Sequence, residues 1–281
     1  WFIRMPRLII GLLVGGALAL AGAVMQGVFS NPLADPGIMG VSAGASLGAV
    51  IAIALGFTSL GMFYMPTFAF VGAFVSVGIT ILLTLRNNKL DTTTLLLAGV
   101  AVSMLLGAFT SGILTMINEY RLREFLFWMV GGLDFRRWDH VLLAVGPIMT
   151  GSVILMMLGR HLNVLVLGDT EARALGVPVM VYRMLFLFLS SVITATAVCV
   201  SGSIGFVGLV VPHIVRLLVG PDHRILLPMA AIGGALFLVF CDTLGRVVAQ
   251  PVEIRVGIMT ALLGAPYFLY LLHRLRSKGG A

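Results

Sequence analysis

Few residues in this 281-residue chain have the types and spacing that enzymes use for catalysis. A P-loop ATPase needs a lysine beside a glycine-rich phosphate cradle, and the two lysines, Lys89 and Lys278, follow no such motif. The five histidines are far apart in the sequence, and His213 has no second ligand at metal spacing. We therefore expect no catalytic residue, no metal site and no directly bound cofactor, with any nucleotide hydrolysis on a separate chain.

One carboxylate, Asp242, lies inside a long apolar segment, where an ionisable residue is a functional candidate by default. In a transporter driven by an ion gradient it would be the coupling carboxylate. Arg246 follows four residues later on the same helix face. We favour pairing between the two, because a neutralised pair explains how both charges lie near a membrane boundary.

A polar connector in the middle of the chain, from Leu167 to Pro178, is patterned like a short helix. Thr170 is placed to cap its start, and Gly176 and Pro178 are placed to end it. Apolar segments long enough to span a bilayer lie on both sides. The pattern therefore predicts a small helix at the membrane surface that serves as a docking element for another protein.

The composition is that of an integral membrane protein. Hydrophobic residues make up 59% of the chain and charged residues 10%, whereas soluble domains carry about 25% charged residues. The net charge of +7 comes from Lys and Arg residues scattered between apolar segments. Because they form no basic stripe with interleaved aromatic residues, a nucleic-acid partner is not expected.

Nine segments are apolar enough to be candidate membrane helices, given that roughly 20 apolar residues cross the hydrocarbon core. They are uniformly apolar rather than alternating, which excludes barrel strands. The segments are 8–28, 41–57, 63–85, 95–117, 141–159, 180–200, 206–218, 225–245 and 256–273. The short segment 206–218 is expected to be a partial or re-entrant helix. We expect one all-α, polytopic transmembrane domain over residues 1–281.

Small residues at four-residue spacing in the first segment predict close packing between helices. These are Gly11, Gly15, Ala19, Ala23 and Gly27, and a similar series runs from Gly40 to Gly56. Between residues 118 and 132 the pattern is instead that of an amphipathic helix at the membrane interface, with Trp128 at headgroup depth.

If the connector is cytoplasmic, the positive-inside rule favours that orientation only slightly. The basic residues on the outer side are then all arginines, which suit bidentate pairing with carboxylates. They would bind acidic anchors of a partner protein or, equally well, lipid headgroups. These arginines are Arg4, Arg7, Arg121, Arg123, Arg136, Arg137, Arg246 and Arg255.

Several stretches, in order along nearly the whole chain, resemble the FecCD-type permeases of bacterial ABC importers. They are Arg4 to Arg7, Gly22 to Gly27 running into Asn31 to Gly37, Leu97 to Val100, Gly168 to Arg173, Ile204 to His213, Asp222 to Arg224 and Leu263 to Pro266. The longer motifs are specific.

The resemblance implies a type II importer permease in the cytoplasmic (inner) membrane of a bacterium or archaeon. Such a permease works as a homodimer with two cytoplasmic P-loop ATPases, which use ATP, and an extracytoplasmic binding protein. The family usually has ten helices, and this chain begins just before the second. The nine segments therefore fit a ten-helix fold whose first helix is missing from the sequence.

The resemblance also assigns residues by position. Arg4, Arg7 and Arg246 match arginines that pair with glutamates of the binding protein. Arg255 stands where proline is usual, which adds a positive group on the outer face. The cytoplasmic gate would involve Asn31, Leu33, Thr92 and Thr93. The segment that couples to the ATPase would be Gly168, Asp169, Thr170, Glu171, Ala172, Arg173, Ala174, Leu175 and Gly176.

We expect the chain to import a metal chelate, a ferric siderophore or haem, by alternating access. Cobalamin or an oxyanion is the alternative cargo within the same family. A secondary transporter that uses Asp242 is the rival from another class. A membrane-embedded enzyme ranks third, because the sequence offers no plausible set of catalytic groups.

Overall fold

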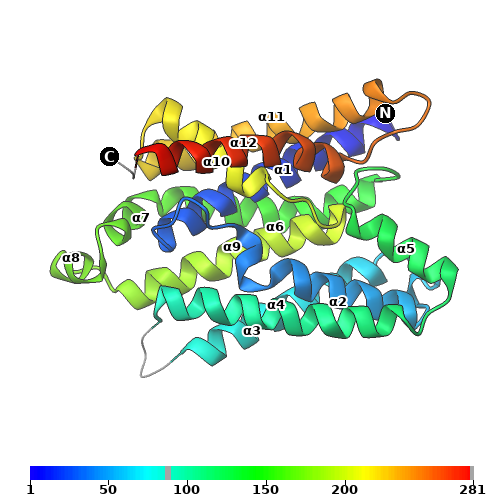
Figure 1. The fold of residues 1–281 in the computed structure, drawn as a ribbon, viewed down its shortest axis with the longest axis horizontal. Helices are drawn as coiled ribbons and strands as arrows, with labels where there is room; N and C mark the ends of the chain where they lie inside the picture. Colours follow the sequence, from blue (N-terminus) through cyan, green and yellow to red (C-terminus); the bar gives the residue numbers. More distant parts are fainter. Residues whose placement is uncertain (86–89, 279–281) are drawn as a thin grey trace.

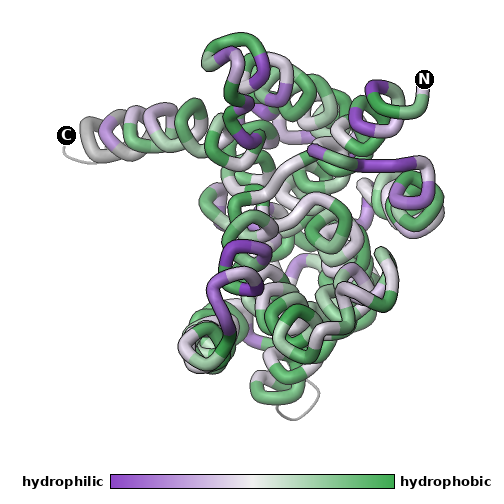
Figure 2. The backbone as a smooth tube through the Cα atoms, turned by 90° about the vertical axis from the view of Figure 1, so that its right-hand side faces the viewer, coloured by the Kyte–Doolittle hydropathy of each residue, from purple (hydrophilic) through white to green (hydrophobic). Residues whose placement is uncertain are grey.

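The structure, a computed structural model, describes residues 1–85 and 90–278. In these residues the regular secondary structure is helical, with no strand. The long helices lie side by side in a bundle, and most connections gather at its two ends (Figure 1). Apolar residues dominate the helices in the view along the bundle (Figure 2). The expected all-α membrane fold is confirmed.

Twelve α-helices and two short 3-10 helices follow one another along the described residues. In order they are α1 (Arg4–Val28), η1 (Pro36–Met39), α2 (Val41–Ala54), η2 (Phe57–Ser59), α3 (Tyr64–Thr84), α4 (Thr92–Leu114), α5 (Glu119–Met129), α6 (Trp138–Met157), α7 (Gly159–Val166), α8 (Asp169–Ala174), α9 (Val179–Ser201), α10 (Val207–Val219), α11 (His223–Val248) and α12 (Val256–Lys278).

Each of the nine predicted segments contains a helix, but the helices differ in length. Within the described residues, six are long and apolar enough to cross a membrane: α1, α3, α4, α6, α9 and α11. The apolar part is shorter in α2, α10 and α12. With 14 residues, α2 is about 21 Å long, less than the roughly 30 Å hydrocarbon core. Nine crossings and a single domain therefore remain predictions.

Helix α1 is the centre of the bundle. It is buried along most of its length and packs on α9, α10 and α11. A Cβ added at Gly15 would overlap the backbone carbonyl of Gly234 in α11, and one at Gly22 would overlap that of Gly208 in α10. Gly15 belongs to the predicted small-residue series, whereas Gly22 lies outside it, and both let helix backbones approach closely.

The predicted amphipathic helix is α5, and the depth of Trp128 in the membrane stays a prediction. Its side chain is 5% exposed and lies against Phe125. In the chain that follows α5, the Gly132 N–H donates to the carbonyl of Ser201 at 2.8 Å. This contact holds the end of α5 against the end of α9.

Candidate functional sites at the two ends of the bundle

The predicted docking helix is α8, at one end of the bundle (Figure 1). It starts one residue earlier than expected, at Asp169, so the prediction that Thr170 caps it is wrong. Gly168 occupies the capping position with φ of 119°, a backbone conformation that glycine adopts readily. Gly176 ends the turn with φ of 76°, as predicted.

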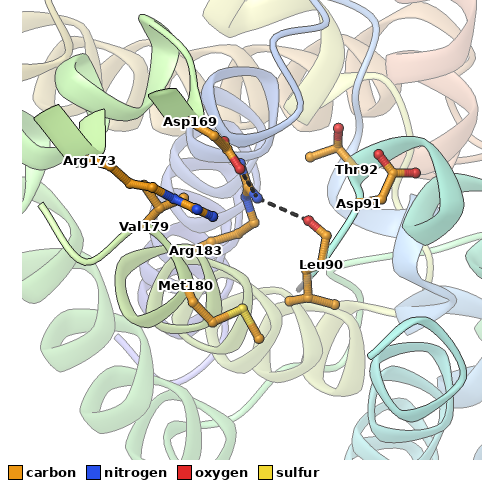
Figure 3. Close-up of a pocket in the computed structure, with 8 residues that line it drawn as sticks. All are labelled: Leu90, Asp91, Thr92, Asp169, Arg173, Val179, Met180 and Arg183. Carbon is orange, nitrogen blue, oxygen red and sulfur yellow. Dashed lines mark hydrogen bonds and ion pairs between the residues drawn. The ribbon is translucent and has the colours of Figure 1, made fainter. Parts of the chain in front are cut away.

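A pair of charged residues fixes α8 to the bundle. The Arg183 guanidinium, on α9, donates to the Asp169 carboxylate at 2.6 and 3.2 Å and to the Leu90 carbonyl at 3.0 Å (Figure 3). The Arg183 side chain is 9% exposed. Ala172, which belongs to α8 itself, is fully buried. Sequence reasoning missed Arg183, although an arginine inside a predicted apolar segment needs a partner.

The anchored helix leaves a set of side chains facing outward. Glu171, Arg173 and Leu175 are exposed, and Leu175 is 64% accessible. We call residues Gly168 to Gly176 the foot. Because its backbone is held while these side chains are free, the foot has the geometry of a preformed docking element.

A pocket of about 320 Å³ lies beside the foot. Asp169 and Arg173 of the foot line it together with Thr92, at the start of α4 (Figure 3). The preceding residue, Asp91, accepts hydrogen bonds from the Thr94 N–H and hydroxyl at 2.8 and 2.7 Å. These bonds lower the pKa of Asp91 below its usual value.

The structure does not bring the predicted gate residues into one cavity. Thr92 lines the pocket beside the foot, and Thr93 is exposed next to it. Asn31 lines a different pocket, and its side chain accepts from the Leu33 N–H at 2.9 Å. The gate therefore stays a prediction.

A second polar network attaches α7, which precedes the foot, to the start of α11. Asn163 accepts from the His223 N–H at 2.9 Å and donates to the Asp222 carboxylate at 2.7 Å. The Arg224 side chain donates to the same carboxylate at 2.8 and 3.0 Å. These bonds hold the pKa of Asp222 well below its usual value. The motif from Asp222 to Arg224 thus ties two helices together.

A cluster of charges lies at the opposite end, around Arg7 of α1. The Arg7 guanidinium meets Asp242 of α11 at 2.9 and 3.0 Å, Glu253 at 2.9 Å and Asp134 at 3.1 Å. The Asp242 side chain is only 7% exposed. Arg246 also pairs with Asp242, at 3.4 Å. The predicted pair exists, but Arg7 makes the closer and bidentate contact.

The four candidate docking arginines therefore differ in availability. Among the described residues, Arg4 is exposed and makes no ion pair, and the Arg246 side chain is 36% exposed. Arg7 is 16% exposed and already bound by three carboxylates. Arg255 donates to the Phe127 carbonyl and lies 4.4 Å above the Phe127 ring. Docking by these four stays a prediction, but Arg7 and Arg255 are occupied within their own chain.

The chain is similar to membrane transport proteins along its whole length. The model of the FecCD transport family matches residues 1–274. The cobalamin import system permease protein BtuC of Halobacterium salinarum is 48% identical over 271 residues, which cover 96% of this chain and 72% of that protein. The hemin transport system permease protein HmuU of Yersinia pestis is 45% identical over 282 residues, covering 98% and 83%.

A solved structure supports the same relationship. It is an ABC transporter assigned to the metal-chelate type, in an inward-facing conformation. It superposes with a TM-score of 0.91 at 36% sequence identity, over 97% of this chain and 86% of that one. The likeness therefore covers both ends of the bundle.

Replacing Arg7 by Ala tests whether this residue holds the bundle together. Without Arg7, the buried Asp242 loses its bidentate partner, and we expect a loss of about 3 kcal/mol in stability. The matched control is Arg246→Ala, which removes a more exposed partner and should cost less than about 1 kcal/mol. Thermal unfolding in detergent measures both.

A double variant separates a lost ion pair from a lost side chain. Arg7→Ala with Asp242→Asn should recover part of the stability, because no unpaired buried charge remains. Equal melting temperatures for Arg7→Ala and the wild-type protein would show that Arg7 does not hold the bundle together.

Proposed function

The chain belongs to the FecCD transport family, and from this premise we propose that it imports a large metal chelate by alternating access. It is a multi-pass permease subunit of an ABC importer. The observation that carries the mechanism is the foot, an exposed helix held rigidly by Asp169 and Arg183. Such an element transmits force only if another protein binds it, and we infer that this protein is a cytoplasmic P-loop ATPase.

The proposed assembly has two permease chains, two ATPases that hydrolyse ATP and one extracytoplasmic binding protein, in the cytoplasmic membrane of a bacterium or archaeon. The ATPases would move the foot, and the network around Asn163 would pass this movement to α11. Arg4 and Arg246, the more available arginines, would receive acidic groups of the binding protein. Each partner must prefer one conformation in order to shift the equilibrium.

The ion-coupled alternative needs Asp242 to exchange a proton or cation during transport. Two arginines contact this carboxylate, at 2.9 and 3.4 Å. Both oxygens of the carboxylate already accept hydrogen bonds from Arg7, and the guanidinium groups compete with a transported cation for them. The contacts therefore favour a structural role for Asp242 over a coupling role.

The cargo we propose is a macrocyclic metal chelate, with haem and cobalamin as the first candidates. The support is that the relatives above are named for cobalamin and hemin transport. The ferric siderophore, which the sequence analysis placed first together with haem, becomes the alternative. Uptake competition in a strain that depends on this importer should show that haem or cobalamin blocks uptake of a labelled chelate. If ferric siderophores compete and neither haem nor cobalamin does, the proposal of a macrocyclic cargo is wrong.

The foot is tested by the double variant Glu171→Ala, Arg173→Ala. Both side chains are exposed, so the permease should stay folded while ATPase affinity falls at least tenfold, equivalent to about 1.4 kcal/mol. Co-purification with the ATPase and ATP hydrolysis stimulated by the binding protein are the readouts. The control for ATPase binding is Arg123→Ala, Glu124→Ala, which removes the same two residue types from α5 and should leave co-purification with the ATPase unchanged. Wild-type coupling in the foot variant would refute this role.

The connection between α7 and α11 is tested by Asn163→Leu, which keeps a similar volume and removes the hydrogen bonds. We expect a stability loss of about 1–3 kcal/mol from the unpaired groups. We also expect basal ATP hydrolysis to persist while its stimulation by the binding protein is lost. Because a merely structural role would lower both activities together, parallel losses would contradict the proposed transmission.

A further inference from the structure

A pocket of about 530 Å³ lies at the end of the bundle that carries the foot (Figure 1). The end of α1 and the loop after it form one side, and α7 and the turn that joins α10 to α11 form the rest. Its volume is in the range of small-molecule sites, about 300–1,000 Å³. Neither the foot nor the charge cluster around Arg7 lines it, so the docking roles proposed above do not account for its polar groups.

The pocket contains an arginine without an acidic partner. Arg216 of α10 donates to the side-chain oxygen of Gln26 at 2.9 Å and forms no ion pair among the described residues. Gln26 is 3% exposed, and its amide nitrogen donates to the Leu209 carbonyl at 3.2 Å, which holds the Gln26 oxygen toward the guanidinium. A charge on an apolar helix is rare and needs a partner or a water-filled cavity. Arg216 therefore leaves a positive charge in the pocket that the chain does not neutralise.

The carboxylate in the lining is already occupied. Asp222 accepts from the Asn163 amide at 2.7 Å and from the Arg224 side chain at 2.8 and 3.0 Å. Arg224 itself lies outside the lining. Because Asp222 and Arg224 neutralise each other, the pocket keeps the charge of Arg216. A guanidinium with free N–H groups recognises a carboxylate or a phosphate.

A histidine in the same lining favours one of these two anions. The Asn163 amide nitrogen donates to a carboxylate, so the Asn163 oxygen is an acceptor, 2.9 Å from the His223 backbone N–H and 2.7 Å from the ring Nδ1. Nδ1 must then carry the proton, and the neutral ring presents Nε2 as an acceptor. This buried Nε2 has no hydrogen-bond partner among the described residues. The site therefore favours a ligand that brings a donor.

The end of α1 leaves room beside this nitrogen. A Cβ added at Gly27 would lie 3.0 Å from His223 Nε2, closer than an ordinary contact. The loop that follows adds polar groups to the lining. Ser30 has φ of 46°, in the strained left-handed region, and the Asn31 side-chain oxygen accepts from the Leu33 N–H at 2.9 Å. The amide N–H groups of Asn31 thus remain available to a ligand oxygen.

We propose that this pocket binds a phosphate group that still carries one proton, either inorganic phosphate or a phosphate monoester. The Arg216 guanidinium receives the charged oxygens, and the P–OH group donates to His223 Nε2. Carboxylates and sulfate carry no proton at neutral pH, so the histidine selects against them. The site goes beyond the proposed function, and only its opening toward the cytoplasm rests on that function. A phosphate bound there joins α1 to α10 and α11 and stabilises the folded chain by mass action.

The test uses the full permease chain in phosphatidylcholine nanodiscs, without the ATPase, whose P-loop would itself bind phosphate. Radiolabelled inorganic phosphate should bind saturably at millimolar concentration. Sulfate at matched ionic strength should compete at least tenfold more weakly, because it has no proton for His223. Arg216→Met should weaken phosphate binding at least tenfold, because the charge-assisted bonds are lost. The control is Arg160→Met, which removes an exposed arginine of α7 outside the lining and should bind like the wild-type chain.

Phosphatidic acid, a lipid with a monoester headgroup, distinguishes the source of the phosphate. If it raises the melting temperature of the wild-type chain but not of Arg216→Met, and displaces labelled phosphate, the site takes a lipid headgroup. If it does neither while free phosphate binds, the ligand is a soluble phosphate.

Two results would overturn the proposal: equal competition by sulfate and phosphate, or phosphate binding by Arg216→Met that matches the wild-type chain. If Arg216→Met does not fold, the comparison of sulfate with phosphate on the wild-type chain decides. Either failure leaves the importer assignment standing, because ATP-dependent uptake tests that assignment separately.

Discussion

The close approach of α1 to α10 and α11 is the constraint on which the rest of the structure depends. Lipid supplies no hydrophobic force between helices, so the helices associate through van der Waals packing and a few polar contacts. Gly15 against Gly234 and Gly22 against Gly208 bring the backbones together. Larger side chains there would push α11 away from α1 and would separate Arg7 from Asp242.

Helix α11 connects the two ends at which we place function. Its 26 residues span about 39 Å. At its start, Asp222 and His223 are bonded to Asn163, next to the foot. Near its end, Asp242 is bonded to Arg7 in the charge cluster at the opposite end of the bundle. A helix fixed at both ends carries displacement as a rigid body, which is one structural way to couple distant sites.

Local patterns predict much of this fold, whereas contacts between distant segments do not follow from them. Apolar segments locate the helices, and Gly176 marks the end of the foot, because both depend on neighbouring residues. The pairing of Asp242 with Arg7 joins residues 235 positions apart, so the sequence pointed only to Arg246. Arg183 was missed for a similar reason, since its partner Asp169 lies on another helix. Of the predicted gate residues, Thr92 and Asn31 line different pockets, so the gate stays a prediction.

The central claim is that this bundle transmits movement and takes its driving force from a protein bound at the foot. The most direct measurement is chelate uptake into proteoliposomes that contain the permease with or without its ATPase, in the presence of the binding protein. We predict uptake only when both ATPase and ATP are present. Uptake driven by a proton or sodium gradient without the ATPase would contradict the account.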